Sequence, residues 1–331
     1  MTDAETGRDR TRGLAAMLGA TVIWGLSSLY YKRIAHVPPL EVLAHRTLWS
    51  LVFFGLLLAW RGRLGELGRL LGAPRSLGLV ALAAIAISLN WFMFIYAIQT
   101  GHAVAASLGY YIFPLVAVLL GAAVFGEHLD GLKWAAIAVA ATAVAVLTLG
   151  LGVAPWISLW LAGTFALYGV AKKKLAAGSM VSVTGEVVLL APLALLWLWG
   201  VHTNGWTDLT GRNLGIFGHD LGDSLLLMFS GVITALPLLL FTTASRNLPL
   251  GTVGVMQYIN PTLQFAVAAL VFAEPVTRWH WIAFPLIWIA VALYSAGTLR
   301  QQRRQRRRAR GQERSTRSRA DRVATSDTTD K

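Results

Sequence analysis

Residues 111–127 read YIFPLVAVLLGAAVFGE, and residues 258–274 read YINPTLQFAVAALVFAE. The two segments align without a gap at a shift of 147 residues, and the match continues to Trp134 and Trp281. A shift of 145 residues also aligns Glu41 with Glu186. Chance similarity between apolar helices is the alternative, but matched tyrosine, proline, glutamate and tryptophan favour duplication. The chain is therefore predicted to contain two related halves.

Both segments belong to apolar runs long enough to cross a bilayer, whose core of about 30 Å takes roughly 20 helical residues. Only 14% of the 331 residues are charged, against about a quarter in soluble chains. Ten such runs are present: Gly13–Tyr31, Leu40–Trp60, Leu77–Ile98, His102–Phe125, Leu132–Leu149, Ala154–Ala171, Met180–Trp199, Leu225–Thr243, Leu250–Phe272 and Trp279–Thr298. The composition thus predicts an all-α integral membrane protein with ten transmembrane helices.

Each half holds five of these runs. Because five is odd, the second half starts on the opposite side of the membrane and forms an inverted repeat of the first. The expected organisation is a cytoplasmic N-terminal segment (1–12), a first five-helix repeat (13–149), a second five-helix repeat (154–298) and a disordered basic tail (299–331). Such repeats commonly enclose a substrate site at mid-depth.

Lysine and arginine in the connections predict the orientation. With a cytoplasmic N-terminus, 24 basic residues lie inside and four outside, which places both termini in the cytoplasm of a multi-pass plasma-membrane protein. The simplest role for the arginine-rich tail is to anchor this topology; binding to anionic lipid headgroups or RNA is the alternative. The tail lacks interleaved aromatic residues, so the net charge of +13 does not favour a nucleic-acid partner. No oligomeric state is predicted.

The sequence carries no pattern typical of an enzyme. It has no cysteine, no H-E-x-x-H, no G-x-S-x-G and no Walker-type phosphate loop. No metal site and no cofactor are predicted.

Two prolines at matching positions indicate the first candidate site. Pro114 and Pro261 cannot donate a backbone hydrogen bond, so the carbonyls of Tyr110 and Gln257 lose their helical partners. An unpaired carbonyl is costly in hydrocarbon, so these groups must face protein, water or ligand. We expect the two kinked segments to meet and line a cavity with Tyr111, Tyr258 and Asn260. Two packing kinks with satisfied tyrosines are the alternative.

Four ionisable residues lie in or at the edge of the apolar runs. Glu41 could contact Arg46, Arg46 could hold an anion, or Glu41 could cap its helix after Pro38 and Pro39. His45 lies one turn from Glu41 on the same face. Glu186 has no cation within a turn of it, so it is either a proton-coupling group or a carboxyl hydrogen-bonded across helices.

The third run of each half carries a different irregularity. Asn90 and Trp91 occupy the place in the first half that Pro237 occupies in the second, so each half is expected to break this helix differently. Asn90 could bind a substrate hydroxyl or join helices. Trp91 and Tyr168 could stack on a planar substrate.

Several motifs together resemble the RarD branch of the EamA transporters in the drug/metabolite transporter superfamily. They are Trp24-Gly25, His45-Arg46, NWFMFIYAI (90–98), ASLGYYIFPL (106–115), LYGVAKKK (167–174) and QYINPTL (257–263). The resemblance covers residues 13–298 and implies ten helices, a 5+5 inverted repeat and a central cavity with alternating access. The chain departs from it at Ala105, where relatives usually have glutamate, and at Phe113, where they have asparagine.

The expected function is a secondary transporter that exports small amphipathic metabolites or drugs, with a proton gradient as the driving force and Glu186 or Glu41 changing charge. Uptake instead of export is one alternative. The other is a membrane scaffold or sensor that does not transport and acts through its basic C-terminal tail.

Overall fold

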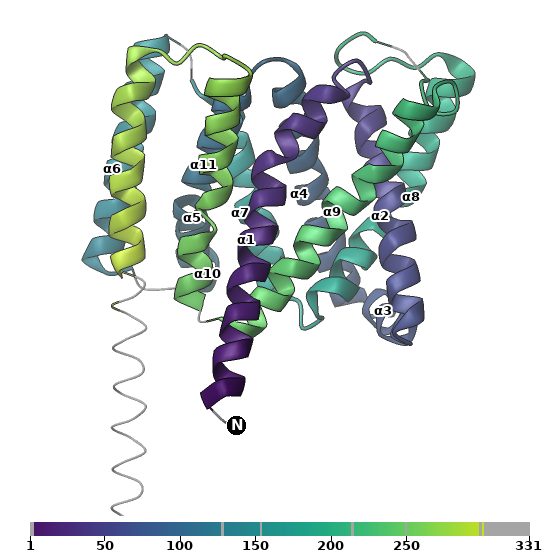
Figure 1. The fold of residues 1–331 in the computed structure, drawn as a ribbon, viewed down its shortest axis with the longest axis horizontal. Coiled ribbons are helices and arrows are strands. Elements are labelled where there is room, and N and C mark those ends of the chain that lie inside the picture. The colour runs from purple at the N-terminus through teal and green to yellow at the C-terminus, as the bar shows by residue number, and fades with distance from the viewer. Residues whose placement is uncertain are drawn as a thin grey trace, which may run out of the picture.

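The computed structural model describes residues 3–126, 129–152, 154–212, 215–248, 250–297 and 300 (Figure 1). The expected basic tail 299–331, apart from Arg300, and the loop residue Glu127 lie outside the described residues. Within those ranges the regular structure is helical, apart from a single bridge between Phe217 and Asp220. The prediction of an all-α chain is confirmed.

The labelled helices are α1 (Asp3–Arg33), α2 (Pro39–Trp60), α3 (Leu64–Gly72), α4 (Pro74–Gln99), α5 (Ala103–Phe125), α6 (Gly131–Leu151), α7 (Trp156–Lys174), α8 (Ser179–Asn204), α9 (Leu221–Asn247), α10 (Leu250–Met256), α11 (Ile259–Ala266) and the π-helix η1 (Val267–Val271). A final helix covers Arg278–Gly297. Among the described residues, eight helices are long and apolar enough to cross a membrane: α1, α2, α4, α5, α6, α8, α9 and the final helix. Helix α7 is 19 residues long, but its last turn consists of three lysines.

Local sequence signals set the helix ends. Pro39 and Pro74 occupy the first turns of α2 and α4, where a missing N–H costs nothing. Asp130 begins α6 by accepting a hydrogen bond from the Lys133 N–H at 3.0 Å. Helices α5 and α6 end at Gly126 and Gly152, whose φ angles of 65° and 71° suit glycine.

The run Leu250–Phe272, which the sequence predicted to be kinked at Pro261, is not one continuous helix. The segment is divided into α10, α11 and η1, with a break at Gln257 and Tyr258. The break lies four residues before Pro261, where the proline nitrogen cannot donate to the Gln257 carbonyl.

Two further expectations are corrected. Helices α4 and α9 run without interruption through Asn90 and Pro237, so neither residue breaks its helix. The connection after Trp60 entered the sequence analysis only through its basic residues, with no helix predicted in it, yet Leu64–Gly72 forms α3, because its leucines make an apolar face that packs on α4 and α8.

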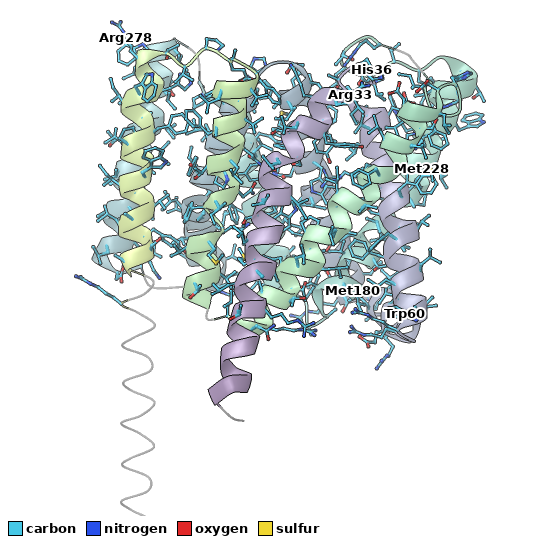
Figure 2. The ribbon with its side chains drawn as sticks, in the orientation of Figure 1. Arg33, His36, Trp60, Met180, Met228 and Arg278 are labelled. Carbon is cyan, nitrogen blue, oxygen red and sulfur yellow. The ribbon has the colours of Figure 1, made fainter. Side chains whose placement is uncertain are left out.

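The most extensive helix packing joins the two halves of the sequence. Helix α5 packs on α7, α1 on α9, α2 on both α8 and α9, and α4 on α7. Figure 1 shows the resulting bundle of side-by-side helices, with α6 and the final helix together at one edge. The two ends of the bundle are marked in Figure 2, where Arg33, His36 and Arg278 lie at one end and Trp60 and Met180 at the other.

Candidate functional site

Glu186 lies in a hydrogen-bonded cluster between α7 and α8. Its carboxylate is 1% exposed and forms an ion pair with the Lys172 ammonium at 2.7 Å. Ser182 donates to the same oxygen at 3.0 Å, and Tyr168 donates to the other at 3.3 Å. The sequence showed no cation near Glu186. The structure corrects this picture, because the lysine comes from the neighbouring helix.

Arg46 is a buried cation held by aromatic rings. Its side chain donates to the Tyr31 hydroxyl at 2.7 Å, and its guanidinium carbon lies 4.0 Å from the centre of the Trp91 ring. The proposed Glu41–Arg46 contact is absent, because Glu41 instead accepts a hydrogen bond from the Ile216 N–H at 3.1 Å. No described carboxylate forms an ion pair with Arg46. The aromatic rings therefore supply the stabilisation that a carboxylate would otherwise provide.

Helix α2 carries four buried polar side-chain atoms without partners, at positions spread around its axis. They are Glu41 Oε2, His45 Nε2, Arg46 Nε and Ser50 Oγ, and all are buried without a hydrogen bond among the described residues. The His45 ring lies 4.5 Å from the Phe217 ring. Buried polar atoms are normally paired, so these positions on α2 are suited to water or a polar ligand.

The two proline-containing segments meet as the repeat predicts. The rings of Tyr111 and Tyr258 are stacked with centroids 6.4 Å apart, and the Tyr111 hydroxyl is 2.6 Å from the Thr262 hydroxyl. The Gln257 carbonyl is not left open, because the Asn260 N–H donates to it at 3.2 Å. The expectation of a free peptide oxygen at this position is therefore wrong.

Unpaired polar atoms in this second region belong to side chains. The Asn260 side chain accepts from Gln264 at 3.0 Å. The Tyr258 hydroxyl and the side-chain oxygens of Gln257 and Gln264 have no partner among the described residues. The role of Tyr111 and Tyr258 as a cavity lining stays a prediction.

Asn90 joins three helices in this conformation. Its amide nitrogen donates to the Leu161 carbonyl at 2.9 Å and to the Thr164 hydroxyl at 3.0 Å, both on α7. Its amide oxygen accepts from Tyr110 of α5 at 3.0 Å. The structure therefore favours the joining role of Asn90 over a substrate contact.

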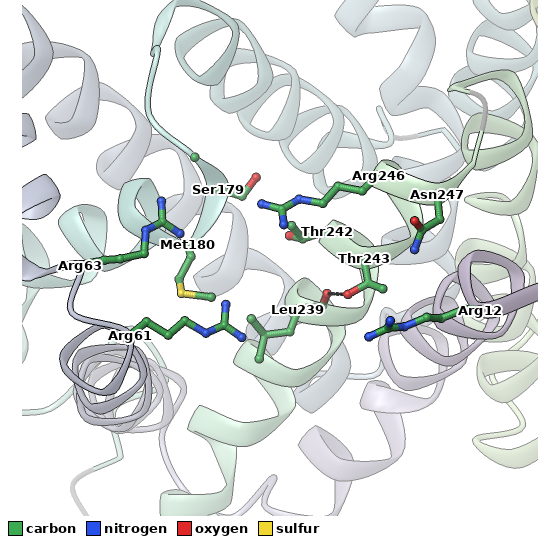
Figure 3. Close-up of a pocket in the computed structure, with 11 residues that line it drawn as sticks. Arg12, Arg61, Arg63, Ser179, Met180, Leu239, Thr242, Thr243, Arg246 and Asn247 are labelled. Atoms are coloured by element: carbon green, nitrogen blue, oxygen red, sulfur yellow. Dashed lines mark hydrogen bonds between the residues drawn. The ribbon is translucent and has the colours of Figure 1, made fainter. Parts of the chain in front are cut away.

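A cavity of about 370 Å³ opens at the end of the bundle that holds Met180 (Figure 3). It is lined by Arg12, Arg61, Arg63, Gly178, Ser179, Met180, Leu239, Thr242, Thr243, Arg246 and Asn247. None of the residues singled out from the sequence is among them. Met180 precedes Glu186 by six residues on α8, which is a rise of roughly 9 Å. The Lys172–Glu186 cluster therefore lies less than two helical turns along α8 from the cavity wall.

Sequence reasoning missed the functional potential of these residues. The four arginines were counted only as indicators of the cytoplasmic side, and they come from three separate places: Arg12 from α1, Arg61 and Arg63 from the connection after α2, and Arg246 from the last turn of α9. It also missed Glu274, whose carboxylate accepts hydrogen bonds at 2.8 Å from the N–H groups of Ala103 and Val104 and thereby caps α5. That cap joins the second half to the first.

Comparison with known proteins defines the class to which this bundle belongs. Residues 11–149 match the model of the EamA-like transporter family. A solved crystal structure shares the fold with a TM-score of 0.56 at 18% identity, over 87% of this chain and 97% of the other.

Relatives narrow the assignment. Protein RarD of Streptomyces exfoliatus is 39% identical over 90% of this chain and 92% of its own length. The chloramphenicol-sensitive protein RarD of Pseudomonas aeruginosa is 31% identical over 88% of this chain and 97% of its own length. The chain belongs to the RarD branch of the EamA transporter family and is a multi-pass membrane protein.

Proposed function

We propose that this protein is a secondary transporter that moves small molecules by alternating access between two inverted five-helix repeats. The first repeat comprises α1, α2, α4, α5 and α6 within residues 13–149. The second comprises α7, α8, α9, the broken segment α10–α11–η1 and the final helix within residues 154–298. Helix α7 and the broken segment are the two spans added to the eight recognised by length and composition.

One observation carries this proposal: the helix packing keeps its pattern when the halves are exchanged. The α1–α9 contact corresponds to α7–α4, α5–α7 corresponds to α11–α1, and α2–α9 corresponds to α8–α4, and every one of these pairs packs together. The α2–α8 contact corresponds to itself. Such a pair of interlocked repeats can exchange conformations, which opens a shared site to either side in turn.

We assign the coupling role to Glu186. Its carboxylate is bound by Lys172, Ser182 and Tyr168, and protonation would remove the charge that holds the lysine. A neutral Glu186 leaves α7 and α8 free to separate, whereas the ion pair holds them together. Charge on this carboxyl therefore links proton movement to the relative position of two helices.

The proposed direction is export from the cytoplasm. Arg12, Arg61 and Arg246 all lie at the cavity end of the bundle, which the excess of basic residues assigns to the cytoplasm together with both termini. A substrate inside the cell would enter through this cavity. The proposed substrates are small amphipathic metabolites or drugs, and chloramphenicol is the first candidate because it appears in a relative's name.

The proposal places the substrate among α4, α5, α7 and the broken segment, beside Arg46 of α2. The candidate contacts are Trp91, Tyr110, Tyr111, Tyr168, Gln257, Tyr258 and Asn260, with Asn90 as a joining residue and Arg46 as an anion contact.

Replacing Tyr111 and Tyr258 by phenylalanine retains the stacked rings and removes both hydroxyls. Each lost hydroxyl should change the free energy of unfolding by no more than about 1 kcal/mol, and the variants should transport more slowly. Unchanged transport of every substrate found would remove these residues from the site.

The test of transport uses purified protein in liposomes. A thermal-shift screen of small metabolites and chloramphenicol at pH 5.5 and 7.5 identifies a ligand, and its flux is then measured with and without an imposed pH gradient. A proton-coupled exporter shows flux that follows the gradient.

Glu186→Gln should retain exchange of substrate across the membrane while losing the response to the gradient, and Lys174→Met serves as a control at the exposed end of α7. If the flux of the natural protein did not change with the pH gradient, the proposal of proton coupling would be wrong.

The rival function is a scaffold or sensor that acts through its basic tail. Deleting residues 300–331 distinguishes the two functions, because a transporter keeps most of its flux without the tail. Loss of the cellular phenotype with intact flux in liposomes would favour the scaffold.

A further inference from the structure

The cavity at the cytoplasmic end carries an excess of positive charge. Four arginines line it, and no aspartate or glutamate does. Glu66 neutralises one of them, because Arg63 donates to both carboxylate oxygens at 2.7 Å. The guanidinium of Arg63 holds the pKa of Glu66 below its ordinary value. The side chains of Arg12, Arg61 and Arg246 have no carboxylate partner among the described residues.

The unpaired arginines approach the cavity from opposite sides. Figure 3 shows Arg61 and Arg63 on one side and Arg12 and Arg246 on the other, with the guanidinium of Arg246 directed toward Ser179. These residues come from α1, the connection after α2, and α9, so the fold gathers them from distant parts of the chain. Like charges brought together in this way repel one another unless an anion lies between them.

The cavity also contains the start of a long helix. Helix α8 is 26 residues long and begins at Ser179, and no side chain caps its first backbone N–H groups. Gly178, Ser179 and Met180 all line the cavity. Free N–H groups and the helix dipole make such a terminus favourable for an anion, in addition to the guanidinium groups.

We propose that this cavity binds a phosphate group, carried either by a soluble phosphate compound or by the headgroup of an anionic phospholipid. A phosphate presents several oxygens to several donors, which suits three arginines and a helix N-terminus better than a single carboxylate does. Thr242 and Thr243 line the α9 wall, but their hydroxyls already donate to the carbonyls of Leu238 and Leu239 at 2.8 and 3.0 Å, so the arginines and the helix terminus supply the donors. A volume of about 370 Å³ accommodates a phosphate with a small organic group attached. The inference does not depend on whether the protein transports.

The soluble arm of the test uses the full-length protein in detergent at constant ionic strength. Thermal unfolding is followed while inorganic phosphate or glycerol 3-phosphate replaces chloride, with glycerol as the neutral counterpart. Both phosphates should raise the melting temperature, and glycerol should not. Arg61→Gln and Arg246→Gln should each weaken the apparent affinity about tenfold, since each removes a charge-assisted contact. Arg75→Gln is the matched control, because it removes one exposed charge from the start of α4 outside the cavity.

The lipid arm compares nanodiscs of phosphatidylglycerol with nanodiscs of phosphatidylcholine. Retention of phosphatidylglycerol is measured by native mass spectrometry after the protein is released. Stabilisation by soluble phosphates assigns the site to a soluble ligand, whereas retention of phosphatidylglycerol that is lost in Arg61→Gln and Arg246→Gln but kept in Arg75→Gln assigns it to lipid. The proposal is overturned if neither source binds, or if all three variants behave alike. Arg246→Lys keeps the charge and checks that the losses do not come from misfolding.

Discussion

Lys172 of α7 and Glu186 of α8 form an ion pair within the bundle. Burial of an ion pair costs desolvation energy, and the cost is offset only when hydrogen bonds satisfy the remaining oxygens. Ser182 and Tyr168 do this for Glu186. Removing one partner leaves the other charge buried and unpaired, which is far less favourable than removing both.

This asymmetry gives a prediction for the pair. Lys172→Met should lower the free energy of unfolding by about 2 to 3 kcal/mol, somewhat less than for a fully buried pair because the lysine is 21% exposed. The double variant Lys172→Met with Glu186→Gln should recover most of the loss. Thermal unfolding in detergent measures both changes. Lys174→Met is the control and should change stability by less than about 1 kcal/mol, because its ammonium lies on the exposed side, 5.5 Å from the Phe125 ring.

The sequence predicted part of this residue-level picture. It singled out Glu186 because a carboxylate within an apolar run is costly, and it brought Tyr111 to Tyr258 because the repeat places both at one depth. It could not predict the lysine partner. Lys172 belongs to a run of three lysines that charge statistics assign to water, and only the folded structure shows that its ammonium contacts Ser182 and Glu186 of α8.

At the scale of elements, glycines determine how closely the helices of the two halves approach. A Cβ atom added to Gly231 of α9 would lie 2.6 Å from the carbonyl carbon of Trp49 in α2, and this neighbour is backbone that cannot rotate away. Gly109 has the same function between α5 and α7, where an added Cβ would lie 2.8 Å from the Ser158 carbonyl oxygen. Hydropathy located the helices well, but it carries no information about which faces touch, so these contacts were not predicted.

Substitution of Gly231 tests the close approach. Gly231→Ala should force α2 and α9 apart and cost about 1 to 3 kcal/mol, the usual range for overpacking. Gly163→Ala in α7 is the matched control, because an added Cβ there meets nothing within 4 Å. It should leave stability unchanged or raise it by up to about 1 kcal/mol through helix propensity. Equal melting temperatures for the two variants would show that the α2–α9 contact is loose.

At the scale of the whole molecule, the sequence predicted two related halves, and in the structure helices of one half pack on helices of the other. Among the labelled helices α1 to α11 and η1, the five most extensive contacts all join one half to the other. Shared packing of this kind follows from burial, since each apolar helix gains most by contacting as many others as possible. The duplicated sequence could indicate the repeat, but the order of helices in space depends on contacts between residues more than a hundred positions apart.

The number of spans can be tested because the natural chain has no cysteine. Gly68→Cys places a thiol on exposed α3, where an added side chain meets nothing within 4 Å, and Leu209→Cys places one at a loop residue that is 79% exposed. Between them lie α4, α5, α6, α7 and α8. If all five helices cross the membrane, the two thiols lie on opposite sides, and a membrane-impermeant maleimide labels position 209 in intact cells and position 68 only after permeabilisation. The three lysines at the end of α7 could instead keep that helix at the membrane surface. Four crossings would then remain, the two thiols would lie on the same side, and both positions would be labelled under the same condition. Labelling of position 68 alone in intact cells would reverse the assigned orientation, and with it the assignment of the arginine-lined cavity to the cytoplasm.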